Sequence, residues 1–354
     1  MGFRTLSQND PDFHSYLLGT FSKTERALPV QSLNVGTKSE QIVFQIVPLN
    51  EIQMPNFFSK WLAIFKIHHL LWVGAPAFLM LAKVWLDDQV LDLELGAFAL
   101  AGVIFLLLGC NLYNDFLDHV SGVDRLQQNQ SQKALQKGWV TAADTRFWAL
   151  VFIGLGILLG LNPLFEREEL LSWVLLPTCL ALIYGIFSWR GFKYRWGAEL
   201  ALFCLMGPLL SIGYQIAFTS SWDIEGFLMG WLMGWLVVLT LHLKNFEQIL
   251  VGSQFGFRNS IAFLGFEKSK RLIEACWIGF CLQFVLFHFL YTPAQWAWAS
   301  LVPAAVSITF LRQLRKLESP AGSRIQAVVQ MGRICVWLGL GIWLASTSFY
   351  FLWL

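Results

Sequence analysis

The sequence is poor in charged side chains, and this scarcity gives the first indication of its class. Lysine, arginine, aspartate and glutamate make up 14% of its 354 residues, whereas about 25% is usual in soluble domains. Hydrophobic residues make up 56%, and the mean hydropathy is +0.55. A chain with so few groups that face water is expected to form one membrane bundle rather than two soluble domains.

Several signatures of other protein classes are also missing. The six cysteines include no Cys-x-x-Cys pair, so neither a disulfide framework nor a zinc site is expected. The net charge is only +2, which does not suggest a nucleic-acid partner. Residues 1–55 are polar and hold no long apolar core, so we expect no signal peptide.

Long apolar segments, in contrast, are abundant. A helix that spans the bilayer needs roughly 20 mostly apolar residues, and helices are required because backbone groups in lipid must bond within their own segment. Nine spans are predicted: 61–86, 96–117, 145–163, 170–189, 198–219, 226–243, 272–290, 295–311 and 331–354. The expected fold is therefore an all-α polytopic membrane bundle of about nine transmembrane helices.

The charges of the connecting segments predict how this bundle is oriented. Lysine and arginine gather in alternate connections, and the connections between them are acidic or neutral. Because basic loops mark the cytoplasmic side, we expect a cytoplasmic N-terminus in the cell (inner) membrane. Residues 1–57 would form a polar cytoplasmic extension, with 42–47 suited to one short strand, and residues 58–354 the transmembrane domain.

A polar cluster interrupts the apolar pattern at the cytoplasmic end of the second predicted span. Asn111, Asp115 and Asp118 are spaced by four and three residues, so they share one helix face, and Asn114 neighbours Asp118. Charged groups inside membrane segments are costly and usually functional. Two carboxylates and a carboxamide on one face offer the hard oxygen ligands that suit magnesium together with a substrate phosphate.

Basic side chains follow this cluster where a phosphate group would need them. Gly122 permits a turn after the helix, Asp124 adds an acid, and Lys133 and Lys137 come next. Three more basic residues occupy the following basic connection: Arg190, Lys193 and Arg195. A diphosphate between magnesium and such cations is electrostatically favourable, although each basic residue is also explained by topology alone.

Two histidines, His68 and His69, lie inside the first predicted span beside Lys66. The pair either faces a substrate cavity or simply packs within the bundle. Lys66 is expected to extend its ammonium group to the headgroups.

Residues 111–124, which read Asn-Leu-Tyr-Asn-Asp-Phe-Leu-Asp-His-Val-Ser-Gly-Val-Asp, resemble the first aspartate-rich motif of the UbiA superfamily of intramembrane prenyltransferases. The Gly-x-Asp ending is most similar to the dihydroxynaphthoate prenyltransferases of menaquinone synthesis. Residues 133–141 resemble the Arg-Pro-Leu-x-x-Gly stretch of that family. Residues 184–199 resemble its tyrosine-to-lysine loop and the Gly-x-Glu opening of its fifth span, and the nine spans match the family.

The resemblance implies a magnesium-dependent transfer of a prenyl group from a prenyl diphosphate to an aromatic acceptor in quinone biosynthesis. The catalytic residues would be Asp115, Asp118 and Lys193. Magnesium would bind to Asp115, Asp118 and Asn114. The resemblance assigns the diphosphate to a further set of residues: Asn111, Asn114, Lys133, Arg190 and Tyr184.

The second aspartate-rich motif of that family is degenerate in this sequence. Residues 242–249 read His-Leu-Lys-Asn-Phe-Glu-Gln-Ile, so Asn245 and Ile249 replace aspartates and only Glu247 is retained. Glu247 and Asn245 are therefore expected to form a weaker second magnesium site. The erosion leaves open a non-catalytic relative that binds an isoprenoid lipid. A transporter is a third hypothesis, although the two halves of the sequence show no repeat.

Overall fold

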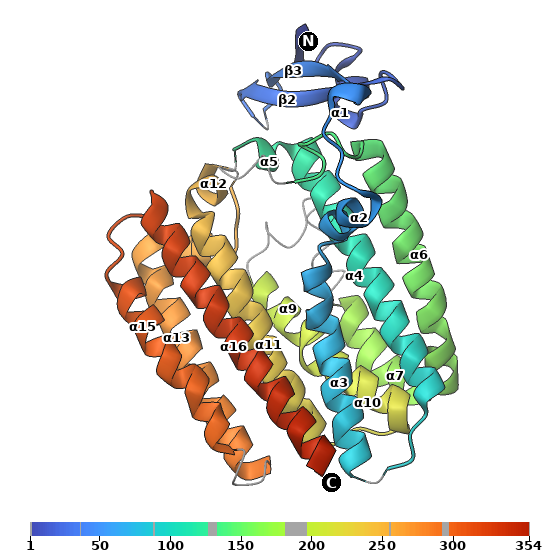
Figure 1. Ribbon diagram of the computed structural model, residues 1–354, viewed down its shortest axis with the longest axis vertical. Helices are drawn as coiled ribbons and strands as arrows, with labels where there is room; N and C mark the ends of the chain where they lie inside the picture. The colour runs from blue at the N-terminus through green and yellow to red at the C-terminus, as the bar shows by residue number, and fades with distance from the viewer. Residues whose placement is uncertain are drawn as a thin grey trace. The chain divides into compact units, whose positions relative to one another are not determined.

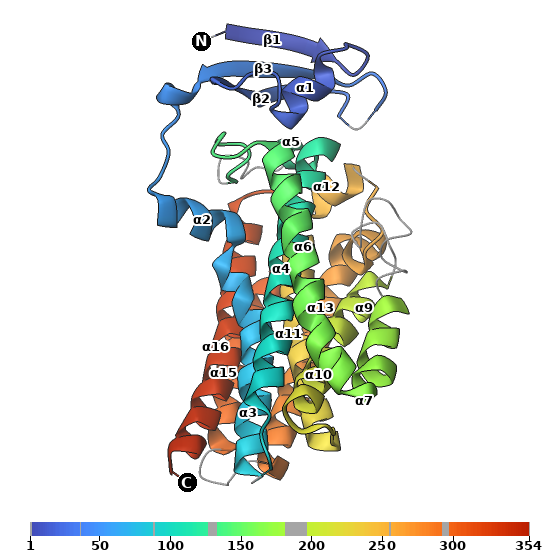
Figure 2. The same cartoon turned by 90° about the vertical axis from the view of Figure 1, so that its right-hand side faces the viewer.

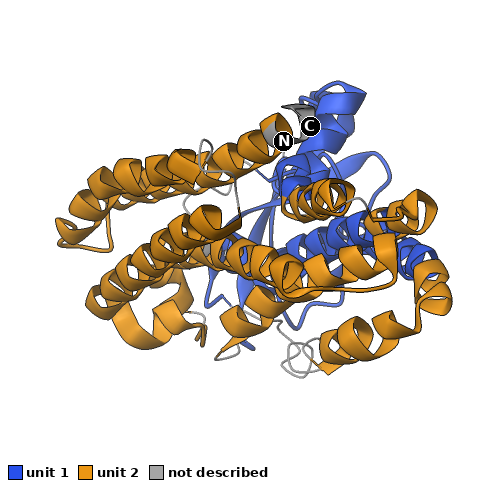
Figure 3. Ribbon diagram, turned by 90° about the horizontal axis from the view of Figure 1, so that it is seen from below, with its two compact units in different colours: residues 1–71, 101–160 blue, residues 72–100, 161–354 orange. Residues whose placement is uncertain are grey.

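The computed structural model describes residues 2–35, 37–87, 89–126, 133–180, 197–254, 256–291 and 297–353. Most of these residues are helical (Figure 1). The chain divides into two compact units, coloured separately in Figure 3. Unit 1 comprises residues 1–71 and 101–160, and unit 2 comprises residues 72–100 and 161–354.

Seven helices within the described residues are long and apolar enough to cross a membrane. They are Ile67–Leu86, Leu93–Ser121, Ala142–Glu166, Ala198–Thr219, Ile224–Glu247, Ser260–Tyr291 and Ser323–Phe349. The span expected at 170–189 extends outside the described residues, and the span expected at 295–311 corresponds to the shorter α15 (Leu301–Arg315). The prediction of a polytopic helical membrane bundle is confirmed.

Unit 1 begins with an antiparallel sheet of three strands in the order β1-β3-β2. The strands are β1 (Gly2–Ser7), β2 (Glu25–Leu33) and β3 (Gln41–Pro48), and the short helix α1 (Phe13–Leu18) packs beside them. The single strand expected at 42–47 lies within β3, the central strand of the sheet. Its alternating pattern is clear in the sequence because Ile42 and Phe44 are fully buried. The two edge strands gave no clear pattern, since β1 buries only Leu6 and Pro29 interrupts β2 at a bulge.

The helices of unit 1 are α2 (Phe57–Phe65), α5 (Val123–Leu126) and the parts of α4 (Leu93–Ser121) and α6 (Ala142–Glu166) that fall within its residues. Helices α4 and α6 approach each other closely through glycines. A Cβ added at Gly102 would lie 3.1 Å from the carbonyl oxygen of Gly156, and one added at Gly109 would lie 2.8 Å from that of Ala149. Small residues allow this backbone-to-backbone packing, as is common between membrane helices.

The first predicted span, 61–86, is not one helix. Helix α2 ends at Phe65, and Lys66 adopts the left-handed conformation with φ of +49°. A short 3₁₀ turn (Ile67–Leu70) then leads into α3 (Leu71–Leu86). Figure 2 shows α2 lying crosswise to α4. A left-handed lysine is uncommon, and the ion pair described below holds its side chain in place.

Two buried contacts join the N-terminal segment, at α1 and at Glu40 just before β3, to the end of α4 and to α5. Glu40 and Arg125 form an ion pair of 2.5 Å, with only 6% and 4% of their side chains exposed. His119 Nε2 lies 3.1 Å from the carbonyl oxygen of Leu17, to which it donates a hydrogen bond. Arg125 also donates to the carbonyl of His119 at 2.8 Å. These contacts hold the turn at Gly122, whose φ of +87° suits glycine.

Unit 2 is built around α11 (Ile224–Glu247). Its other helices are α3, α7 (Glu168–Leu170), α9 (Ala198–Met206), α10 (Pro208–Thr219), α12 (Ile249–Gln254), α13 (Ser260–Tyr291), α15 and α16 (Ser323–Trp353). Helix α11 packs against α9, α10, α13 and α16. The close approach depends on Gly207, where an added Cβ would lie 2.6 Å from the carbonyl oxygen of Gly230. The fifth predicted span breaks at this glycine, because Gly207 leaves the helical conformation before Pro208 begins α10.

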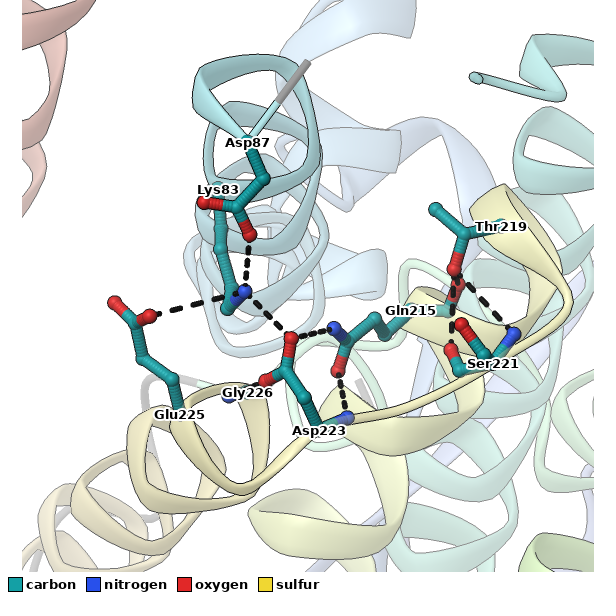
Figure 4. Close-up of polar contacts among 8 residues, drawn as sticks. All are labelled: Lys83, Asp87, Gln215, Thr219, Ser221, Asp223, Glu225 and Gly226. Carbon is teal, nitrogen blue, oxygen red and sulfur yellow. Dashed lines mark hydrogen bonds and ion pairs between the residues drawn. The ribbon is translucent and has the colours of Figure 1, made fainter. Parts of the chain in front are cut away.

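A second polar cluster in unit 2 joins α3 to the start of α11 (Figure 4). The Lys83 side chain is 5% exposed, and its ammonium lies 2.5 Å from Asp87 and 2.7 Å from Asp223. Glu225 is the third acid, 3.8 Å away. Because a buried ammonium is costly unless it is paired, these contacts tie the two helices together at the end away from Glu247.

Acid is expected to weaken unit 2 through Asp223. Burial alone would raise the pKa of Asp223, but hydrogen bonds from Gly226, Lys83 and Gln215 outweigh it and hold the pKa below the ordinary value of 3.8. A depressed pKa in the folded state gives stability above the unfolded-state pKa that is lost as pH falls through the folded value. We expect Asp223→Asn to lose less stability than the wild type between neutral pH and about pH 3.

The measurement is the midpoint of thermal unfolding of the detergent-solubilised protein over this pH range. Glu168→Gln, which changes an exposed acid of unit 2, is the control and should follow the wild-type curve. Parallel curves for the wild type and Asp223→Asn would contradict the assignment.

The buried pair of unit 1 is expected to matter far more than an exposed one. Glu40→Gln leaves the Arg125 guanidinium buried without its counter-ion, which should cost about 3 kcal/mol and lower the thermal midpoint. The double variant Glu40→Gln, Arg125→Met removes the stranded charge and should recover part of the loss. The control is Asp12→Asn, which breaks an exposed pair with Arg4 and should leave the midpoint unchanged. Equal effects of Glu40→Gln and Asp12→Asn would count against this account.

Candidate functional site

The polar cluster predicted at the end of the second span lies on the final turns of α4. One continuous helix carries Asn111, Asn114, Asp115 and Asp118. Asn114 Nδ2 donates a hydrogen bond of 3.3 Å to Asp118. The ammonium of Lys133 lies 3.7 Å from Asp115 and 3.6 Å from Asp118. The two acids therefore approach the same point, as their spacing in the sequence predicts.

Lys133 is shared by three carboxylates. Besides Asp115 and Asp118, it pairs with Asp124, which is 1% exposed and accepts a second hydrogen bond of 2.9 Å from Gln136. Burial raises the pKa of Asp124 despite the nearby ammonium. Burial alone would lower the pKa of Lys133, but the three carboxylates prevail and raise it. The mutual attraction keeps Lys133 charged.

Lys66 supplies a second cation to this cluster. Its Nζ donates to Asp115 Oδ1 at 2.6 Å, and the two side chains are 25% and 14% exposed. The prediction that this lysine extends to the headgroups is therefore wrong, because the helix break at Lys66 directs it to Asp115. His69 lies beside the cluster, with its Nδ1 3.4 Å from Asn111 Oδ1. His68 shows no such contact with the cluster among the residues described.

Residues 242–249, predicted above to be a degenerate second motif, lie at the end of α11 and the start of α12, in unit 2. Glu247 accepts a hydrogen bond of 2.5 Å from Arg333 of α16. Asn245 is half-buried on the same helix end. The charge of the one retained acid is thus already compensated by an arginine.

Two further polar residues of unit 2 were not predicted as a site. Glu199 is 5% exposed, and its Oε1 accepts a hydrogen bond of 2.8 Å from the backbone nitrogen of Ser260. Its other oxygen is buried and has no hydrogen-bond partner in the described chain. His242 is 4% exposed and close enough to interact electrostatically with Glu199. The sequence signal for this pair was Glu199, the glutamate of the Gly-x-Glu stretch at the start of the fifth predicted span. A glutamate inside a predicted span is expected to be buried, and buried glutamates without counter-ions are rare.

The remaining basic residues separate into two groups. Tyr184, Arg190, Lys193 and Arg195 lie outside the described residues. Lys137 is described, and its ammonium lies 4.6 Å from the centre of the Trp139 ring. A cation–π contact therefore holds Lys137, whereas Lys133 alone of the two nearby lysines joins the acidic cluster.

The chemistry of the α4 donor set fits a magnesium ion, which prefers carboxylate and amide oxygens. In this structure those carboxylates are neutralised by Lys66 and Lys133. No group of three or more histidine, cysteine, aspartate or glutamate side chains is arranged for a metal within the described residues. A divalent ion on Asp115 and Asp118 would therefore need the lysines to move aside and oxygens from substrate or water to complete its shell.

Solved membrane proteins share this fold. A digeranylgeranylglyceryl phosphate synthase aligns with a TM-score of 0.53 and 14% identity, over 82% of this chain and 98% of its own. A UbiA homologue from Archaeoglobus fulgidus bound to GPP and Mg²⁺ aligns with 0.52 and 12%, over 80% and 99%. The apo UbiA homologue from Aeropyrum pernix K1 aligns with 0.56 and 16%, over 78% and 96%.

No curated protein sequence matches this chain significantly, and the structural identities are low enough that they establish only the fold. The sequence itself carries the family relationship. The model of the UbiA prenyltransferase family matches residues 71–331, which include the acidic cluster, Lys133 and residues 242–249. This chain belongs to the UbiA prenyltransferase family.

Proposed function

We propose that this protein is a magnesium-dependent prenyltransferase that moves a prenyl group from a prenyl diphosphate to an aromatic acceptor in quinone biosynthesis. The observation that carries the proposal is the acidic face of α4, where Asp115 and Asp118 converge on one cation. Structural neighbours bound to GPP and Mg²⁺, and to DMAPP and Mg²⁺, support the donor and the metal. The Gly-x-Asp ending at Asp124 supports the menaquinone branch.

In this proposal Asp115, Asp118 and Asn114 would hold Mg²⁺, and Asn111 would lie beside the diphosphate. When bound, the ion stabilises the negative charge that grows on the leaving diphosphate as the carbon–oxygen bond breaks. Because that charge is larger in the transition state than in the substrate, contacts to it accelerate the reaction.

The basic residues have the complementary role. Lys133 already lies at the acidic face, where its ammonium would contact a diphosphate bound through the metal ion. We assign Arg190, Lys193 and Tyr184 to the same diphosphate, with Lys193 as the catalytic cation. The allylic cation formed by departure of the diphosphate would then alkylate the aromatic ring of the acceptor.

We further propose that the active site faces the cytoplasm of the cell (inner) membrane. The support is that lysine and arginine gather in alternate connections, and such connections usually lie on the cytoplasmic side. Residues 1–57 would be a cytoplasmic extension of the transmembrane domain formed by 58–354. The small core of the three-stranded sheet, which includes Phe13, Ile42 and Phe44, supports an extension that has a packed centre of its own.

A second candidate function is non-catalytic binding of an isoprenoid lipid. The observation that favours it is the ion pair between Glu247 and Arg333. In the enzyme hypothesis Glu247 and Asn245 hold a second magnesium ion, but an arginine already satisfies that carboxylate. Binding of a prenyl diphosphate without its cleavage would select this candidate.

The enzyme hypothesis predicts that Asp115→Asn and Asp118→Asn each lower magnesium-dependent diphosphate release by roughly 100-fold or more. Each change removes one negative charge from the proposed metal ligands while preserving the size of the side chain. The assay supplies prenyl diphosphates of several lengths with a panel of quinol precursors, with and without Mg²⁺, and detects diphosphate and prenylated product.

Asp12→Asn changes an exposed acid of the N-terminal extension, just before α1, and should retain full activity. Wild-type protein that binds a prenyl diphosphate but releases no diphosphate with any acceptor would refute the enzyme hypothesis.

A further inference from the structure

Unit 1 contains a cavity of about 290 Å³ that the proposed reaction does not use. Its walls come from four places: the N-terminal extension, α2, the flank of α4 at Leu112, and the segment from Trp139 into α6. None of the residues of the acidic cluster lines it. Part of the wall precedes residue 71, where the match to the family begins. The cavity is therefore a feature of this chain's extension as much as of the helical bundle.

Three charged side chains line this cavity from three elements. Arg26 comes from β2, Lys60 from α2 and Asp144 from the first turn of α6. Indole rings make up much of the remaining wall: Trp61, Trp139 and Trp148. The lining thus combines two cations, one anion and several large aromatic faces.

These three charges are unpaired within the described part of the chain. None of them forms a salt bridge there, whereas Lys66, Lys133 and Arg125 all do. Arg26 donates one long hydrogen bond of 3.3 Å to the carbonyl of Glu25, but its Nε is buried and has no partner among the same residues. A buried donor without a partner is costly, so a ligand that accepts a hydrogen bond from Arg26 would be favoured here, beside the half-buried Lys60 and the exposed Asp144.

The surroundings of the cavity place it at the boundary between membrane and water. Helix α2 exposes Phe57 and Phe58 by 70% and 77%, and α6 exposes Phe147 by 60%. Such exposed aromatic side chains on a membrane protein are expected in the interfacial layer. The ring of Trp148 in the cavity wall is followed by the ring of Phe152, with 6.0 Å between the ring centroids. These two rings give an apolar path for a hydrocarbon chain.

We propose that this cavity binds the headgroup of a zwitterionic phospholipid. The phosphate would lie between Arg26 and Lys60, and the ammonium would lie at Asp144 against the indole faces, which attract cations. One acyl chain would follow Trp148 and Phe152. Charge complementarity selects this ligand, because a purely anionic lipid would leave Asp144 without a partner and an amine alone would leave both cations without one.

The bound lipid would connect three separate elements of unit 1 through their charged side chains. Arg26 belongs to the N-terminal sheet, Lys60 to the crosswise helix α2, and Asp144 to a membrane helix. A headgroup that bridges all three would fasten the extension to the bilayer at this point. This inference does not depend on prenyl transfer.

The test is native mass spectrometry of the full-length protein, released from detergent with equal amounts of phosphatidylethanolamine and phosphatidylglycerol that carry the same acyl chains. We expect the ethanolamine lipid to be retained roughly tenfold more tightly. Arg26→Gln and Lys60→Gln should each weaken retention of both lipids roughly five- to tenfold. Asp144→Asn should remove the preference for ethanolamine while the glycerol lipid binds as before.

The controls change exposed residues of the same charge in the extension, Lys23→Gln and Glu51→Gln, and should bind as the wild type does. Thermal midpoints of all variants confirm that each is folded. Equal retention of the two lipids by the wild type would overturn the proposal. So would retention that is insensitive to Arg26→Gln and Lys60→Gln, or displacement of the lipid by inorganic phosphate at equal concentration.

Discussion

A carboxylate remains charged beside a hydrocarbon layer only when a cation compensates it, and this requirement organises the end of α4. Asp115, Asp118 and Asp124 share the ammonium of Lys133, and Lys66 adds a second positive charge. Three carboxylates and two ammonium groups leave a net charge of −1, so the cluster retains an attraction for a further cation. A magnesium ion, as proposed, would compensate the same carboxylates in place of the lysines.

The sequence predicted the features that depend on neighbours along the chain. Helical spacing placed Asp115 and Asp118 on one face, and the apolar runs identified the membrane helices. Features that depend on distant partners were missed. The helix break at Lys66 was not predicted, because no proline or glycine marks it. It is associated with a contact between Lys66 and Asp115, which is 49 residues away in the sequence. The Glu40–Arg125 pair joins residues 85 apart, which no local pattern reveals.

The contact between Glu247 and Arg333 bears on the predicted degeneracy of the second motif. Loss of two aspartates in a protein that still held two magnesium ions would leave positive charge uncompensated. Here an arginine from α16 accompanies the remaining acid, Glu247. In the proposed function, Asp115 and Asp118 therefore hold lysines that a metal ion would displace, whereas Glu247 holds an arginine.

The glycines between α4 and α6 have a mechanical consequence. Where Gly102 and Gly109 lie against the backbone of α6, no layer of side chains separates the two helices, and interlocked backbones resist sliding and rolling. Helices α4 and α6 should therefore tilt in the bilayer together, as one rigid body. Lateral pressure exerted by lipids on the outer surface of α6 would then change the tilt of α4 as well. The tilt of Asp115 and Asp118 relative to the membrane would change, but the distance between them would not.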